Sequence, residues 1–210
     1  MATLSTELTA MHLSFEAFLA RRDSDRRAEW IEGRIEYRMP ASLTHQLLCK
    51  FLLLILELFV GEKSLGTVLA APFLMRIASR PSGREPDLIF VSSANRARLR
   101  ETYLDGPADL VAEIVSPESR ERDRGDKFEE YAGAGVMEYW LIDPELRIAE
   151  FFVLKEGVYR PARIDAEGRF WSVALPGFWI DVTWLWDQPG LLDVLKRWQI
   201  PAPDPEQNVA

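Results

Sequence analysis

The sequence contains the apolar run Asp109-Leu110-Val111-Ala112-Glu113-Ile114-Val115, which Ser116-Pro117 closes and one acid interrupts. A short apolar run that ends at a proline predicts a buried strand in the middle of a sheet. An unpaired carboxylate inside such a strand is costly or stays protonated, so Glu113 needs a compensating group. A divalent cation is one such group; the alternative is a half-buried strand from which Glu113 points to solvent.

Asp87 is a second acid beside an apolar segment, because it opens the predicted strand 87–91 directly after Pro86. On its own, Asp87 is equally typical of a strand-start residue that hydrogen-bonds to nearby amides. Mg²⁺ is usually held by one or two carboxylates together with water and substrate phosphate. Asp87 and Glu113 together therefore predict a metal site.

Lys127 lies on a predicted helix that follows Ser119 and carries Phe128 and Tyr131 on its apolar side. Only five of the 25 basic residues are lysines, so a lysine beside the apolar face of a helix is unusual in this chain. The alternative is a surface lysine that pairs with Asp123, four residues earlier. The sequence leaves both readings open.

The rest of the pattern alternates strands and helices, with hairpins toward both ends. Helices are expected near 15–19 after the N-cap Ser14, from Ser42 or Thr44 to a stop at Gly61, and over 191–198. Strands are expected over 67–70, 73–77, 139–142, 147–154 and 158–163, and a loop over 80–84. A hairpin is expected over 29–37, with its turn at Glu32-Gly33. The predicted buried side chains of this hairpin are Trp30, Ile35 and Tyr37. This order predicts an α/β or α+β fold with a mixed central sheet flanked by helices and additional β-hairpins. We expect one domain over residues 1–200 and a flexible tail over 201–210.

Composition and charge exclude several kinds of site. The single cysteine, Cys49, forms no internal disulfide, and two histidines are too few for a Cys/His zinc site, so a metal must be held by carboxylates. The net charge of −8 disfavours a nucleic-acid partner, but residues 76–127 hold ten basic and ten acidic side chains and are locally neutral. The apolar run 47–60 is too short and too charged to span a membrane, and residues 1–20 do not read as a secretory signal. We therefore expect a soluble, cytoplasmic protein with no membrane partner.

Four segments carry a family resemblance. They are Glu85-Pro86-Asp87-Leu88-Ile89-Phe90-Val91, the run from Pro107 to Pro117, Arg122-Asp123-Arg124-Gly125-Asp126-Lys127-Phe128-Glu129-Glu130-Tyr131, and Glu138-Tyr139-Trp140-Leu141-Ile142-Asp143-Pro144. Together they resemble the Uma-two family, within the PD-(D/E)XK restriction-endonuclease-like superfamily, and imply its fold. The segment 29–33 and the helix start 42–45 extend the resemblance to about residues 13–187. His45 in that helix start is also family-like, although such a histidine more often caps or packs, and Cys49 is expected in the core.

The resemblance assigns roles to individual residues. By position, it implies that Asp87 and Glu113 are metal ligands, that Lys127 orients or polarises the attacking water, and that Glu29 is an additional acid near the metal. The superfamily places the lysine two residues after the glutamate, and that position here is Val115. The Uma-two pattern places it on the following helix, where Lys127 lies.

The implied function is that of a metal-dependent endonuclease that hydrolyses phosphodiester bonds of nucleic acid. DNA is the expected substrate and Mg²⁺, or alternatively Mn²⁺, the expected cofactor. Candidate phosphate contacts, each of which fits a solvated position equally well, are Arg96, Arg98, Arg100, Arg120, Arg122 and Arg124. Two alternatives are a catalytically silent module that binds nucleic acid or protein, which the net charge favours, and a metallohydrolase of small phosphoesters. The tryptophan-rich segment 171–186 fits a homodimer surface as well as a core.

Overall fold

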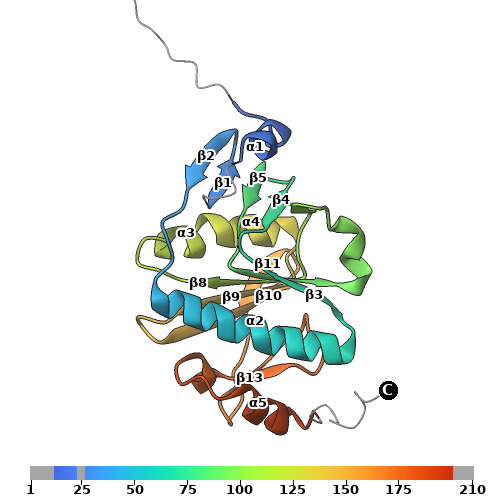
Figure 1. The fold of residues 1–210 in the computed structure, drawn as a ribbon, viewed down its shortest axis with the longest axis vertical. Helices are drawn as coiled ribbons and strands as arrows, with labels where there is room; N and C mark the ends of the chain where they lie inside the picture. Colours follow the sequence, from blue (N-terminus) through green and yellow to red (C-terminus); the bar gives the residue numbers. More distant parts are fainter. Residues whose placement is uncertain (1–11, 23–26, 201–210) are drawn as a thin grey trace, which may run out of the picture.

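The computed structural model describes residues 12–22 and 27–200, and its central layer is a six-stranded mixed sheet (Figure 1). The strand order across this sheet is β11-β10-β9-β8-β6-β3. Its strands are β3 (Gly66–Ala70), β6 (Leu88–Ser92), β8 (Leu110–Ile114), β9 (Glu138–Asp143), β10 (Ile148–Lys155) and β11 (Val158–Pro161). β8 lies inside the sheet, antiparallel to β6 and parallel to β9, so the predicted central strand is confirmed.

Helices cover both faces of this sheet (Figure 1). The long helix α2 (Leu43–Lys63) crosses one face, and α3 (Arg120–Arg124) and α4 (Asp126–Ala134) lie over the other. A mixed sheet between helical layers confirms the predicted fold class.

The ends of α2 follow local chemistry that the sequence indicated only in part. Ser42, rather than Thr44, caps the helix, because its hydroxyl accepts the His45 amide at 3.2 Å. The predicted stop at Gly61 is wrong, since the helix continues to Lys63 and its C-cap is Ser64, which takes a left-handed φ of 53°. A glycine inside a helix costs only about 1 kcal/mol relative to alanine, and the packing of α2 on the sheet offsets it.

By length and composition alone, α2 is the one helix among the described residues that could cross a membrane. It has 21 residues, and is therefore longer than the run 47–60 suggested. A core helix passes the same test, and α2 buries Leu48, Leu52, Ile55 and Leu56 almost completely.

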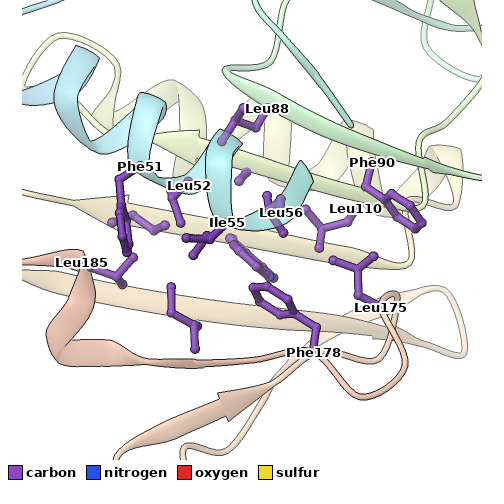
Figure 2. Close-up of a cluster of buried hydrophobic side chains, with 14 of the residues drawn as sticks. Phe51, Leu52, Ile55, Leu56, Leu88, Phe90, Leu110, Leu175, Phe178 and Leu185 are labelled. Carbon is purple, nitrogen blue, oxygen red and sulfur yellow. The ribbon is translucent and has the colours of Figure 1, made fainter. Parts of the chain in front are cut away.

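Side chains of α2 and the central sheet form the larger hydrophobic core, which Figure 2 shows. In this core Phe51, Leu52, Ile55 and Leu56 of α2 gather with Leu88, Phe90 and Leu110 of the sheet and with Leu175, Phe178 and Leu185 of the C-terminal segment. Successive residues of β8 point to opposite faces, so Ala112 belongs to this core, while Val111 and Val115 lie in the core on the other face. Glu113 has the same parity as Val111 and therefore faces α4.

A second sheet of five strands packs at the N-terminal end, in the order β2-β1-β5-β4-β7. It contains β1 (Ala28–Ile31), β2 (Arg34–Tyr37), β4 (Leu74–Ile77), β5 (Ser82–Arg84) and β7 (Tyr103–Asp105), and α1 (Phe15–Arg21) begins at the N-cap Ser14 beside it. The predicted hairpin and its turn at Glu32-Gly33 are present. Tyr37, predicted to be buried, is 62% exposed, because β2 is the edge strand of this sheet.

The segment expected as a loop over 80–84 is corrected in part, since its second half is β5. Ser82 and Gly83 pair with Ile31 and Trp30 of β1, and β4 pairs with the other side. A Cβ on Gly83 would lie 2.6 Å from Phe15 Cε2. The glycine therefore marks a close approach inside a sheet, which composition alone does not distinguish from a turn.

The C-terminal segment closes the side of the molecule beyond α2 (Figure 1). It forms β12 (Arg169–Trp171), β13 (Trp179–Asp181), the short 3-10 helix η2 (Val182–Leu185) and the predicted helix α5 (Leu191–Trp198). Within the tryptophan-rich segment, Trp184 is buried in the larger core, whereas Trp171 is 47% exposed. The tail 201–210 lies outside the described residues.

Candidate active site

Glu113 leaves β8 toward α4, where two side chains one helical turn apart donate to it. Lys127 Nζ lies 2.7 Å from Glu113 Oε1, and the Tyr131 hydroxyl lies 2.8 Å from the same oxygen. Positions i and i+4 of a helix share a face, which explains why both donors reach one carboxylate. Glu113 is only 3% exposed, so the alternative of a solvent-facing acid is wrong.

Lys127 is itself buried among three carboxylates. Besides Glu113, its Nζ lies 3.3 Å from Asp123 Oδ1 and 3.8 Å from Glu29 Oε1. The pairing expected of a surface lysine with Asp123 is therefore present, but at a buried position. Burial lowers the pKa of Lys127, but the negative charges of Glu113, Asp123 and Glu29 outweigh this effect and raise the pKa above its usual value.

Asp87 directly precedes β6, and its side chain hydrogen-bonds to the backbone of β8 next to the paired residues of the two strands. Leu88 pairs with Ala112, and one step further the Oδ2 atom of Asp87 accepts the Ile114 amide at 2.9 Å. His45 Nε2, in the first turn of α2, lies 3.1 Å from the same oxygen. His45 thus packs at the site rather than on the surface, and Asp87 is fixed by donors from two different elements.

The two acids have opposite pKa shifts. Burial raises the pKa of Asp87, but the hydrogen bond and charge of His45 and the charges of Arg27 and Lys127 prevail and lower it below its usual value. Burial and the neighbouring carboxylates raise the pKa of Glu113 to about 7, although Lys127 opposes them. Glu113 is therefore the acid that carries the less stable negative charge, as the apolar pattern around it indicated.

Glu29 reaches the site from β1 in the N-terminal sheet. Its carboxylate accepts from Arg84 Nη1 at 3.1 Å and from the Glu85 amide at 3.2 Å, and it also pairs with Arg38. Arg84, 2% exposed, binds Glu130 of α4 at 2.5 Å. Burial raises the pKa of Glu29, but the surrounding cations prevail and hold it well below its usual range. Glu29 thus joins the N-terminal sheet to α4 next to the buried lysine.

A cavity of about 660 Å³ opens among these groups. The four residues predicted for the site, Asp87, Glu113, Lys127 and Glu29, all line it. Its lining holds four cationic side chains, Arg27, Arg38, Arg122 and Lys127, and seven carboxylates, Glu29, Glu85, Asp87, Glu113, Glu118, Asp123 and Glu145. This excess of negative charge attracts cations.

The donor set suits a hard cation bound by few protein ligands. Within residues 12–22 and 27–200, no group of three or more His, Cys, Asp or Glu side chains is arranged to enclose a metal. Asp87 and Glu113 nevertheless line the same cavity, and Mg²⁺ typically takes one or two carboxylates and completes its shell with water and substrate oxygens. These residues therefore fit Mg²⁺ or Mn²⁺ and do not fit a closed zinc site.

The arginines predicted as phosphate contacts lie mostly elsewhere. Four of them are engaged with other groups: Arg98 with the Pro107 carbonyl, Arg100 with Asp105, Arg120 with Asp143 and Arg124 with Glu150. Of the six, Arg122 lines the cavity.

Five charged residues of the cavity lining had no predicted role, namely Arg27, Arg38, Glu85, Glu118 and Glu145. Arg27 and Arg38 flank the hairpin β1–β2, and a flanking arginine carries no sequence signal of its own. Glu85 had a sequence signal, because it stands two residues before Asp87, and the structure shows that its side chain is buried.

The mixed sheet between helices and the buried acid–lysine cluster make the chain an α/β protein with a candidate acidic active site. A family model described as "Uma2: Putative restriction endonuclease" matches residues 15–183, and the chain belongs to this family, which confirms the resemblance seen in its motifs. The fold is similar to that of a crystal structure described as "a putative nuclease belonging to DUF820 from Anabaena variabilis ATCC 29413", with a TM-score of 0.68 and 14% identity over 83% of this chain and 98% of that chain. No curated protein matches the sequence.

Proposed function

We propose that this protein is a divalent-cation-dependent nuclease that hydrolyses phosphodiester bonds of DNA. Its family and its structural neighbour support a nuclease; the cation and the DNA substrate are the further steps of the proposal. The observation that carries it is that Asp87 and Glu113 line one cavity while Lys127 is held 2.7 Å from Glu113.

In this mechanism Asp87 and Glu113 would hold Mg²⁺ or Mn²⁺, whose positive charge would offset the negative charge that develops on the scissile phosphate. Asp87 is prepared for this role, because the Ile114 amide and His45 fix its position. Lys127 keeps its proton, since its pKa is raised, and its ammonium group has three N–H donors. Its Nζ donates a hydrogen bond to Glu113, while Asp123 and Glu29 lie at the longer ion-pair distances of 3.3 and 3.8 Å, so a further N–H would orient the attacking water.

The acidic cavity also suggests how a chain of net charge −8 would bind DNA, which is a polyanion. A phosphate is repelled by the surplus of carboxylates until cations neutralise it. DNA binding should therefore depend on divalent cations more strongly than it depends on the surface arginines.

The test is cleavage of end-labelled single- and double-stranded DNA and RNA by the full-length protein with Mg²⁺ or Mn²⁺, at several salt concentrations. We expect the wild type to cut DNA. The cleavage rates of Asp87→Asn and Glu113→Gln should be lower by a factor of about a hundred or more. Asp187→Asn is the matched control, because its side chain is 81% exposed and lies outside the cavity.

Other outcomes contradict the proposal in distinguishable ways. Cleavage that survives both site substitutions would place the activity elsewhere. Mn²⁺ binding without cleavage of any nucleic acid would favour a catalytically silent module. Hydrolysis of bis(4-nitrophenyl) phosphate without nucleic-acid cleavage would favour a metallohydrolase of small phosphoesters.

Homodimer formation and a cytoplasmic location stay predictions. The segment 171–186 contributes Phe178, Ile180 and Trp184 to the core, and its exposed large hydrophobic side chains are Trp171 and Val173. Sedimentation velocity of the wild type and of Trp171→Ser tests whether these side chains form a contact between two copies.

A further inference from the structure

The two oxygens of the Asp87 carboxylate have different partners. Oδ2 accepts from the Ile114 amide at 2.9 Å and from His45 Nε2 at 3.1 Å, and both donor residues are buried. Two hydrogen bonds occupy the lone pairs of that oxygen. Oδ1 receives both terminal nitrogens of Arg27, each at 3.3 Å. Oδ2 is therefore held by two donors of the fold, whereas within residues 12–22 and 27–200 the hydrogen bonds to Oδ1 come from Arg27 alone, at 3.3 Å.

Arg27 is itself loosely bound. Its side chain is 26% exposed, its contact to the Glu85 carbonyl is 3.2 Å, and its Nε lies 3.5 Å from Glu85 Oε2. That Nε is buried and has no hydrogen-bond acceptor among the residues that the structure describes. By contrast, the buried Arg84 binds Glu130 at 2.5 Å and 2.7 Å. Charge-assisted pairs of full strength have the shorter distances, so the pair between Arg27 and Asp87 is weaker than the pair between Arg84 and Glu130.

We propose that Arg27 is the exchangeable partner of Asp87: a divalent cation takes Oδ1, and the released guanidinium binds a phosphate oxygen of the nucleic acid. This inference rests on the proposed function and adds a residue that binds the substrate backbone. A guanidinium matches the geometry of a phosphate with two parallel N–H donors, and Arg27 already lines the cavity. No covalent bond changes, because the exchange replaces one ion pair by two.

The other cations of the cavity are less suited to this exchange. Lys127 is held by three carboxylates, and Arg38 pairs with Glu29 and Glu36. Arg122 lies on α3, with its Nε 3.8 Å from Asp123, and Asp87 is not among its partners. Arg122 therefore provides a control of equal charge in the same cavity.

The first measurement is the affinity of the full-length protein for Mn²⁺ alone, by isothermal titration calorimetry. We expect Arg27→Gln to bind Mn²⁺ about tenfold more tightly than the wild type, because the competitor for Oδ1 is removed. Arg122→Gln should change the affinity by about twofold or less, because Arg122 does not compete for an oxygen of Asp87. Arg27→Lys, which keeps the charge but loses the fork of donors, should lie between the wild type and Arg27→Gln.

The second measurement is the binding of a fluorescent single-stranded DNA 12-mer, by anisotropy, in Ca²⁺ and in EDTA. In Ca²⁺ the Arg27→Gln variant should bind about tenfold more weakly than the wild type, and in EDTA the two should bind equally, because Asp87 then retains Arg27. Circular dichroism confirms that each variant is folded.

The outcomes separate this inference from the function on which it rests. A wild type that binds no divalent cation overturns both. A wild type that binds Mn²⁺, with Arg27→Gln equal to it or weaker, overturns only the exchange. An equal loss of DNA binding in Ca²⁺ and EDTA also overturns the exchange, because Arg27 would then contact phosphate without being released.

Discussion

Lys127 Nζ meets Glu113 Oε1 at 2.7 Å, although fourteen residues and the change from β8 to α4 separate them along the chain. Val115, at the position where the superfamily pattern has its lysine, is buried in the hydrophobic core on the same face of the sheet. The ammonium group therefore comes from α4, which covers this face of the sheet, and not from the strand that carries Glu113. The lysine can take either place because only the position of its nitrogen matters to the carboxylate.

The stability of the fold should depend on this lysine. Lys127→Met leaves Glu113, Asp123 and Glu29 buried without their shared cation, and breaking a buried ion pair typically costs about 3–5 kcal/mol. We expect the free energy of unfolding in urea to fall by that order, and saturating Mg²⁺ to restore part of it if the ion binds the native state. Lys50→Met, an exposed position of α2, should change it by less than about 0.5 kcal/mol. Equal stability of the two variants would contradict the burial of Lys127.

Two glycines should respond to alanine in opposite directions. A Cβ on Gly66 would clash with the Val91 carbonyl oxygen and lie 2.8 Å from Ser92 Cα, so β3 would have to move away from β6. Gly66→Ala should therefore lower the free energy of unfolding by about 1–3 kcal/mol. Gly133, inside α4, meets nothing within 4 Å, and Gly133→Ala should raise it by about 0.5–1 kcal/mol. Thermal unfolding of both variants measures the difference, and a shared sign would be inconsistent with the packing of β3 on β6.

Cys49 is the single thiol of the chain and should react slowly. It is half-buried against the larger core, and burial, together with the charge of Asp87, raises its pKa to about 11. A two-unit rise from an ordinary thiol leaves about a hundredfold less thiolate at pH 8. The rate of alkylation by iodoacetamide should be lower by at least that factor in the folded protein than in urea, and should still be rising at pH 10. Similar rates in the two states would show that the thiol is exposed.

The sequence predicted the elements whose pattern is local. β8 and Glu113 were recognisable because a lone acid in an apolar run has a cost that something must offset, and the structure places Lys127 and Tyr131 there. The hairpin at Glu32-Gly33 followed from turn chemistry in the same way.

Features that depend on distant partners were not predictable from local pattern. β5 reads as a loop because its pairing with β1 and the ring of Phe15 beside Gly83 come from elsewhere in the chain. Arg27 is one arginine in a charged cluster, and its contact with Asp87 spans 60 residues. Tyr37 has the pattern of a buried residue, and its exposure follows from the edge position of β2, which is a property of the whole sheet.

The position of Glu29 links completion of the candidate site to completion of folding. This residue belongs to the N-terminal sheet, yet it lies 3.8 Å from the ammonium group of α4 and shares Arg84 with that helix. The cavity is thus walled by segments that meet only when the hairpin, the central sheet and α4 have all docked. An incompletely folded chain contains all the acidic residues of the site, but the cavity that brings them together has not formed. The proposed cutting activity would therefore switch on with the completion of tertiary structure, and a half-made chain would leave nucleic acid intact.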